Sequence, residues 1–211
     1  MNAGRVAIGL LLGGALFVGS ALADPGPMTE RLYINYSGML PGWTVIPTQR
    51  GGNVELTEIV PPGQDRQNWT DQVAVNIVYG AQENPPDLLA ERFRAIQAEC
   101  QETSLGPVSP SMENGYPTAL RAVACTKVKK WSQGEVSLYK AWKGKDGMYL
   151  VARSWRGAPF DKGKVPVPPE TTLKWLAFIQ SVVLCDTQDP KRPCPVSKAQ
   201  PQAQPQPTQK P

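Results

Sequence analysis

The sequence predicts an α+β fold, in which an antiparallel sheet with a three-stranded C-terminal meander carries two main helices. Three observations support this prediction. Residues 54–79 hold two runs of alternating apolar and polar residues around a loop. Residues 119–155 hold three further strand-like runs joined by short turns, and residues 84–100 and 170–184 repeat apolar side chains at helical spacing. Strands and helices grouped in this way, rather than strictly alternating, indicate an α+β protein.

The chain before residue 54 is expected to form short strands. Leu32, Ile34 and Tyr36 share one parity and predict a first strand, and residues 43–46 predict a second. A turn is expected at residues 49–53, because paired glycines and asparagine tolerate positive φ.

The segment 54–79 predicts two half-buried strands that start the main sheet. Residues 73–79 place β-branched and aromatic side chains on one parity, which is typical of a strand with one buried face. A polar loop at 61–68 separates the two strands and ends at Trp69. An indole at such a junction can bury its ring while its N–H still finds a partner.

Two helices are expected to pack on the sheet. Asn84 suits the N-cap of the first helix, and Pro85 suits its first helical position. Apolar side chains of this helix recur on one face, namely Leu89, Phe93, Ile96 and Cys100. Residues 104–117 hold three prolines and two glycines and predict a loop. A Gly/Pro-rich loop at 157–169 leads to the second helix at 170–184, which has a broad apolar face.

The meander consists of the runs 119–129, 135–143 and 148–155. The short connections between them require antiparallel neighbours. The second connection ends at Gly147, where a hairpin turn would use positive φ.

The ends of the chain differ from its middle. Residues 1–23 predict a secretory signal peptide, with Arg5 as the positive region and Ala21–Ala23 as the cleavage site. A membrane anchor is the alternative, but the apolar run is too short for a comfortable span, and no other run is long enough. Residues 24–195 are expected to form one domain, and the Pro/Gln-rich residues 196–211 a disordered tail. The predicted location is the periplasm or the exterior.

The four cysteines all follow the predicted cleavage site: Cys100, Cys125, Cys185 and Cys194. An even number in an exported chain implies two disulfides, for which three pairings are open. Proximity in the sequence favours Cys100–Cys125 and Cys185–Cys194. A metal site is the alternative, but it needs short ligand spacing and usually histidine, and the chain has no histidine. No metal and no cofactor are therefore expected.

The charge argues against a nucleic-acid partner. The formal charge is +4, and it becomes +3 without the signal peptide, which carries Arg5 and no acid. Lys127, Lys129 and Lys130 form the densest basic cluster. A nucleic-acid surface needs a broader basic face, so a solvated strand end is the expected role of this cluster.

The order of the expected elements resembles the PsbP/Mog1-like α+β fold over roughly residues 30–185. The shared features are the element order and Asn68-Trp69-Thr70 at the start of a strand. Members of that fold serve as extrinsic subunits, partner-binding proteins and exported proteins. The resemblance therefore implies an accessory or binding role in an exported bacterial protein, but a fold does not fix a function.

The absence of histidine excludes Ser-His-Asp and Cys-His catalysis. A pair of carboxylates, as in glycoside hydrolysis, remains open, because four acids cluster in the sequence: Glu55, Glu58, Asp65 and Asp71. A carboxylate-dependent enzyme acting on a glycan is thus the alternative function. Acids on the exposed face of a strand are the more common explanation.

The six tryptophans are many for this length. Packing in the core and on the sheet explains most such residues. A stacking surface is the second interpretation, and the candidate binding residues are Trp69, Trp142 and Trp155, of which the last two would share one sheet face. The sequence therefore predicts an exported, non-enzymatic binding or accessory protein that engages an envelope protein or a cell-wall component.

Overall fold

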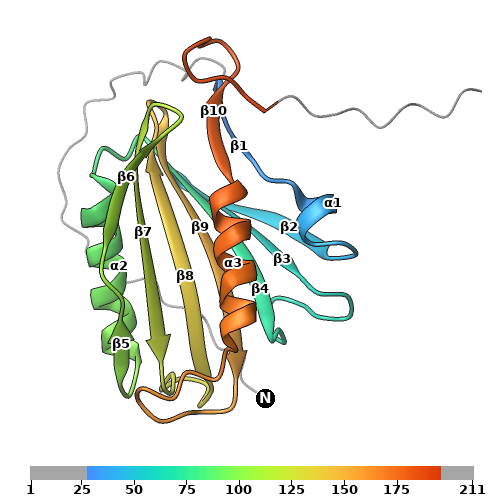
Figure 1. The fold of residues 1–211 in the computed structure, drawn as a ribbon, viewed down its shortest axis with the longest axis vertical. Helices are drawn as coiled ribbons and strands as arrows, with labels where there is room; N and C mark the ends of the chain where they lie inside the picture. Colours follow the sequence, from blue (N-terminus) through green and yellow to red (C-terminus); the bar gives the residue numbers. More distant parts are fainter. Residues whose placement is uncertain (1–27, 196–211) are drawn as a thin grey trace, which may run out of the picture.

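The computed structural model describes residues 28–195, which form a mixed fold with an antiparallel sheet and three helices (Figure 1). The predicted signal peptide and the Pro/Gln-rich tail lie outside the described residues. In chain order the elements are β1 (Glu30–Tyr33), α1 (Tyr36–Met39), β2 (Thr44–Gly51), β3 (Val54–Val60), β4 (Asp71–Tyr79), α2 (Pro85–Glu99), β5 (Thr103–Leu105), β6 (Ser109–Glu113), β7 (Tyr116–Cys125), β8 (Gly134–Lys143), β9 (Gly147–Gly157), α3 (Pro169–Ser181) and β10 (Val183–Asp186).

The main sheet has eight strands, seven of them in the order β2-β3-β4-β9-β8-β7-β5, and β6 also pairs with β7. Strands β7, β8 and β9 are antiparallel neighbours, and β9 also pairs with β4 along its length. A separate two-stranded ladder joins β1 to β10, with Glu30 opposite Asp186. The first and last strands of the described chain therefore lie side by side (Figure 1).

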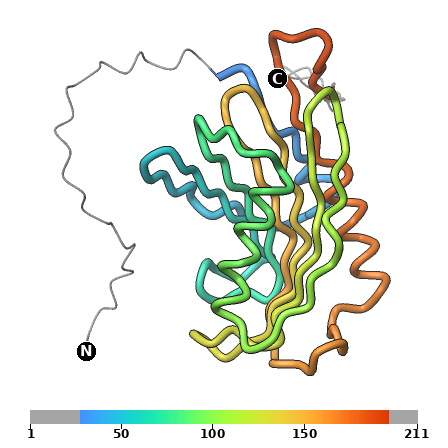
Figure 2. The backbone as a smooth tube through the Cα atoms, turned by 90° about the vertical axis from the view of Figure 1, so that its left-hand side faces the viewer, coloured from blue at the N-terminus to red at the C-terminus, as the bar shows by residue number. Residues whose placement is uncertain are grey.

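The two long helices cover opposite faces of the sheet (Figure 2). Side chains of β9 alternate between the faces, as the pleat requires. Met148 and Leu150 join the cluster under α2, whereas Tyr149 and Val151 join the cluster under α3. Because both faces are covered, nearly all of β9 is buried.

The β1–β10 ladder is fastened to the turn between β8 and β9 by a buried carboxylate. Glu30 accepts hydrogen bonds from the backbone N–H groups of Lys145 (2.8 Å) and Asp146 (3.0 Å). The side chain of Lys145 in turn donates to Asp186 at 2.6 Å. Residues of β1 and β10, the first and last strands of the described chain, thus bind the same turn between β8 and β9.

The segment 104–117 was predicted to be a loop, but it contains most of β5 and all of β6. Both strands pair with β7. Pro110 lies within β6, where it is tolerated because β6 pairs with one strand and leaves its other edge unpaired. The prolines therefore mark a sheet edge rather than a loop.

The second main helix ends at Ser181 and not at residue 184 as predicted. Val183 and Leu184 belong to β10, opposite Tyr33 and Leu32 of β1. Their partners are about 150 residues earlier, so the local apolar pattern carried no signal of the strand.

Three local expectations also need correction. Tyr36 starts α1 instead of ending a strand, because the side chain of Asn35 accepts a hydrogen bond from Gly38 N at 3.0 Å. Asn84 holds the N-cap position of α2, but its side chain makes no capping hydrogen bond. Gly147 does not have positive φ; a Cβ there would lie 3.0 Å from the Cα of Tyr79, so close backbone approach requires the glycine.

Candidate functional site

A groove of about 520 Å³ runs between α2 and the strands β7 and β8; we call it the α2 groove. Arg92, Ala95, Ile96 and Glu99 of α2 form one wall. Val123 and Cys125 of β7, together with Glu135, Ser137 and Tyr139 of β8, form the floor. Val128, Lys130 and Trp131 close the end of the groove with the loop between these strands.

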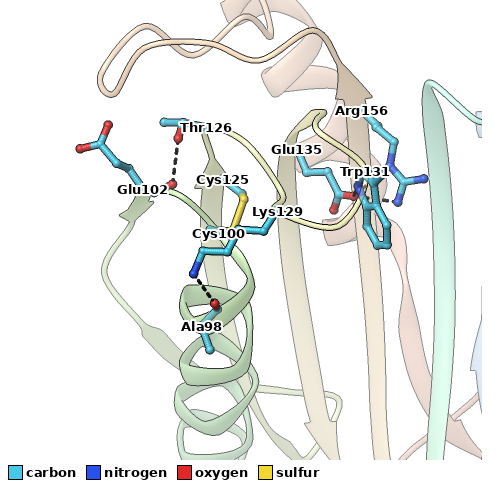
Figure 3. The surroundings of a disulfide bond; sticks show 9 residues. All are labelled: Ala98, Cys100, Glu102, Cys125, Thr126, Lys129, Trp131, Glu135 and Arg156. Carbon is cyan, nitrogen blue, oxygen red and sulfur yellow. Dashed lines mark hydrogen bonds and ion pairs between the residues drawn. A yellow bond between two sulfur atoms is a disulfide. The ribbon is translucent and has the colours of Figure 1, made fainter. Parts of the chain in front are cut away.

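A disulfide holds the wall of the groove to its floor. Cys100, which follows α2 directly, is bonded to Cys125 at the end of β7 (Figure 3). The second disulfide joins Cys185 to Cys194 beyond β10. Both bonds are those that sequence proximity favours. The first bond is buried with Val128 in a small apolar cluster, and it therefore fixes the distance between α2 and the sheet.

The loop after β7 is tied to the end of α2 by the backbone. Lys129 N donates to Glu99 O at 2.9 Å, and the Lys129 side chain donates to Ala98 O at 2.7 Å (Figure 3). The last carbonyl groups of a helix lack intrahelical partners, so a lysine there both satisfies them and complements the helix dipole. This contact gives Lys129 a structural role and takes it out of the expected strand, which ends at Cys125.

Trp131 stands at the rim of the groove and is 42% exposed. Its indole N–H donates to Glu135 at 3.2 Å, and the guanidinium of Arg156 lies 4.7 Å from its ring centroid (Figure 3). Arg156 also stacks on Trp69 at 3.9 Å and pairs with Glu135 at 2.7 Å. A guanidinium that contacts two indole rings and is paired with a carboxylate helps to keep the Trp131 ring in place.

The candidate binding residues named from the sequence do not form one surface. Trp142 is 0% exposed, so no ligand can stack on it. Trp69 is 7% exposed and lies beneath Arg156. Trp155 is half-buried, and it packs against the same apolar cluster as Trp142, on the α3 face. The shared face of Trp142 and Trp155 was correctly predicted, but it is the face that α3 covers.

The four clustered acids are each engaged in separate contacts. Glu55 accepts from Arg50 at 3.0 Å and from the Tyr79 hydroxyl at 2.9 Å. Glu58 is buried and bound by Arg66 and by Gln72. The strand pairing puts Glu55 opposite Ile77 and Glu58 opposite Ala74, which lie on opposite faces of the sheet. These two acids therefore cannot flank one substrate.

The other two acids also have local roles. Asp65 accepts from the backbone N–H groups of Gln67 and Asn68, both at 2.8 Å, and these bonds lower the pKa of its carboxyl group. Asp71 binds Arg153 through both carboxylate oxygens. Burial raises the pKa of Asp71, and the neighbouring Arg153 opposes that effect. The four acids that cluster in the sequence thus each stabilise a loop or a strand through local contacts.

Arg153 repeats the arrangement of Arg156 on the other face of β9. Its guanidinium lies 4.4 Å from the Trp43 ring and 5.4 Å from the Trp175 ring, next to a small cavity that all three side chains line. Burial lowers the pKa of Arg153, and Asp71 opposes that effect. Four of the six tryptophans therefore pack against two arginines of one strand, which explains much of their abundance.

Sequence reasoning missed Trp131 and Arg156 as functional candidates. Trp131 was assigned only to a turn. A large aromatic residue in a polar turn is unusual because turns are exposed, and that was the available signal. Arg156 offered none, since its partners come from three separate segments.

No protein-family model matches the chain, and a comparison with the curated proteins finds no match.

Proposed function

We propose that this protein is an exported, non-enzymatic binding or accessory protein of the bacterial envelope, located in the periplasm, that engages a protein or an envelope component through the α2 groove. One observation carries the proposal: Trp131 is 42% exposed at the rim of an apolar hollow of about 520 Å³. Binding sites are concave, mostly apolar and of this size, and tryptophan is the residue that contributes most often to binding energy.

Two other observations favour an exported binding protein. The disulfides fit an oxidising compartment. No helix within residues 28–195 has the length and apolar character needed to cross a membrane. The resemblance of the element order to the PsbP/Mog1-like fold favours an accessory role as well, because members of that fold bind partner proteins.

The alternative, a carboxylate-dependent enzyme that acts on a glycan, needs two acids at one pocket. Glu55 and Glu58 lie on opposite faces of the sheet, and Asp71 is held by Arg153. The groove has Glu99 and Glu135 among its lining residues, but Glu135 is bound to Arg156 and to Trp131. The contacts of the described residues therefore favour binding over this chemistry.

The test compares what three immobilised proteins retain from a bacterial envelope extract: the wild type, Trp131→Ala and Leu173→Ala. Leu173 is a matched control because it is 67% exposed on α3, on the opposite face from the groove. We expect Trp131→Ala to lose the component that the wild type and Leu173→Ala retain. Retention of the same component by Trp131→Ala would contradict the use of the groove.

A further inference from the structure

The two ends of the α2 groove differ in charge. At the end formed by the loop after β7, the lining includes Glu99 and Lys130, whose ammonium lies 5.6 Å from the Trp131 ring centroid. Glu135 at this end is paired with Arg156. The two cations of this end, Lys130 and Arg156, and its two acids, Glu99 and Glu135, therefore sum to no net formal charge.

Arg92 marks the other end of the groove. It is exposed on α2, its guanidinium lies 5.9 Å from the Tyr139 ring centroid, and within residues 28–195 it forms no ion pair. Tyr139 lines the groove beside it. An unpaired guanidinium next to a phenol is suited to bind an anionic group by charge-assisted hydrogen bonds.

The surface between the two ends is mostly apolar, and Ser137 on its floor is buried. Ile96, Val123 and Val128 line it together with the Cys100–Cys125 disulfide, and Trp131 closes it. Arg92 and Glu99 are separated by about 10 Å along the helix axis, because a helix rises about 1.5 Å per residue. This length accommodates an extended chain of roughly eight carbon atoms.

We propose that the α2 groove binds a free, single-chain amphiphile with an anionic head group, such as a medium-chain carboxylate. The head group contacts Arg92 and the hydroxyl of Tyr139, and the chain lies on the apolar floor and ends against Trp131. This inference rests on the proposed function and names the class of envelope component that the groove takes.

A free amphiphile fits better than a membrane surface. Exposed acids lie on both sides of the groove, with Glu91 next to Arg92 and Glu102 just beyond the disulfide. An anionic bilayer attracts broad basic faces rather than single cations between acids. Arg92 is therefore suited to bind the head group of a single amphiphile in the α2 groove.

The test measures binding of octanoate and of octanol by isothermal titration calorimetry at neutral pH. We expect octanoate to bind about tenfold more tightly than octanol, which is the effect of one charge-assisted contact. Arg92→Gln should weaken octanoate about tenfold and leave octanol unchanged, whereas Arg94→Gln should change neither. Arg94 is the control because it is exposed on α2 and does not line the groove.

A second pair of variants fills the groove without disturbing the core. Ala95 and Ala98 are both exposed on α2, but only Ala95 lines the groove. We expect Ala95→Trp to abolish binding of both probes and Ala98→Trp to leave it intact, with thermal melting showing that both variants fold.

Equal binding of the two probes, unchanged octanoate binding by Arg92→Gln or Ala95→Trp, or binding only to phosphatidylglycerol vesicles would each overturn the proposal. A result that rejects the amphiphile as ligand can be distinguished from a result that rejects the proposed function. If octanoate fails to bind while an envelope component is still retained in a Trp131-dependent manner, the groove binds a different ligand class.

Discussion

The guanidinium carbon of Arg156 lies 3.9 Å from the centroid of the Trp69 ring. Trp69 lies in the loop before β4, and Arg156 lies near the end of β9. The backbone N–H of Arg156 donates to the carbonyl oxygen of Thr70 at 3.0 Å. The same guanidinium lies 4.7 Å from the ring centroid of Trp131, in the loop after β7. One side chain thus joins three segments at the rim of the α2 groove, and the position of the exposed indole depends on it.

Replacing Arg156 with lysine should destabilise the fold and loosen Trp131. Lysine keeps the charge but loses the planar group that stacks on two rings and reaches Glu135. We expect a loss of about 1–2 kcal/mol in the free energy of unfolding, measured by urea denaturation. Arg94→Lys, on the exposed side of α2, is the control and should change stability little. Equal stabilities of the two variants would show that the stacking adds nothing.

Glu30 should be among the acids whose loss is most costly. Its carboxylate accepts two backbone N–H groups of the β8–β9 turn and the hydroxyl of Tyr149 at 3.3 Å. Glu30→Ala leaves two part-buried backbone donors and one buried hydroxyl without this partner, which costs about 2–4 kcal/mol in the free energy of unfolding. Glu91→Ala, at an exposed position of α2, is the comparison. A thermal melt in which the two variants coincide would contradict the role of Glu30 as a turn cap.

The stability should depend on pH through Asp186. The Lys145 side chain and the Gln188 backbone N–H donate to its carboxylate, and they lower its pKa from 3.8 to about 2. The unfolded chain then takes up the proton at a higher pH than the folded chain does. The contribution is complete above the unfolded pKa and is lost as the pH falls from about 4 to about 2.

Asp186→Asn should therefore lower stability at neutral pH and flatten its decline over that acidic range. Denaturant titrations at a series of pH values measure this dependence. Asp161→Asn is the control, since Asp161 is an exposed acid paired only at the surface with Lys164. If the wild type and Asp186→Asn declined in parallel, the contact with Lys145 would not stabilise the fold.

The two disulfides should each contribute measurably to stability. The bonds close loops with sequence separations of 25 and 9 residues. By loop-closure entropy they contribute about 3.5 and about 2.5 kcal/mol, respectively. Replacing Cys100 and Cys125 with serine, or Cys185 and Cys194 with serine, should therefore lower the melting temperature by several degrees. Non-reducing peptide mapping checks the pairing, and a peptide that joins Cys100 to Cys185 would contradict it.

The parts of the fold that were predictable are those with local signals. Pro85 and the apolar spacing of Leu89, Phe93 and Ile96 located α2 to within one residue of its start. The runs that form β8 and β9 were visible because short turns separate them, and short turns require antiparallel neighbours. By contrast, β10 depends on pairing with β1, and β6 depends on a sheet edge that hosts proline. Long-range pairing leaves no local pattern, so these strands were missed.

The candidate site was harder to predict for a related reason. Tryptophan content offered a stacking surface only as the second interpretation, after packing in the core. Burial decides which indole is available, and burial depends on the packing of distant segments. The side chain of Trp142 lies on the sheet face that α3 covers, whereas Trp131 lies in a turn and is exposed. The Cys100–Cys125 bond was predicted from the sequence, and it also borders the groove.

The last prediction concerns the C-terminal boundary of the domain. Asn114 donates its side-chain N–H groups to Leu184 O at 2.9 Å and Pro193 O at 3.2 Å. The guanidinium of Arg192 lies 4.4 Å from the Tyr116 ring. These contacts fasten the segment after β10 to the turn between β6 and β7, and Cys194 closes it. A chain truncated after Pro195 keeps all of them.

We therefore expect truncation after Pro195 to leave the melting temperature nearly unchanged. Truncation after Asp189 removes Arg192 and Cys194 and leaves Cys185 unpaired, so it should lower the melting temperature by several degrees, in line with a loss of about 2–4 kcal/mol. Differential scanning calorimetry of the two truncated proteins and the full chain measures this difference. If the chain that ends at Pro195 melted several degrees early, residues 196–211 would contribute to the fold, and the domain boundary would have to move beyond Pro195.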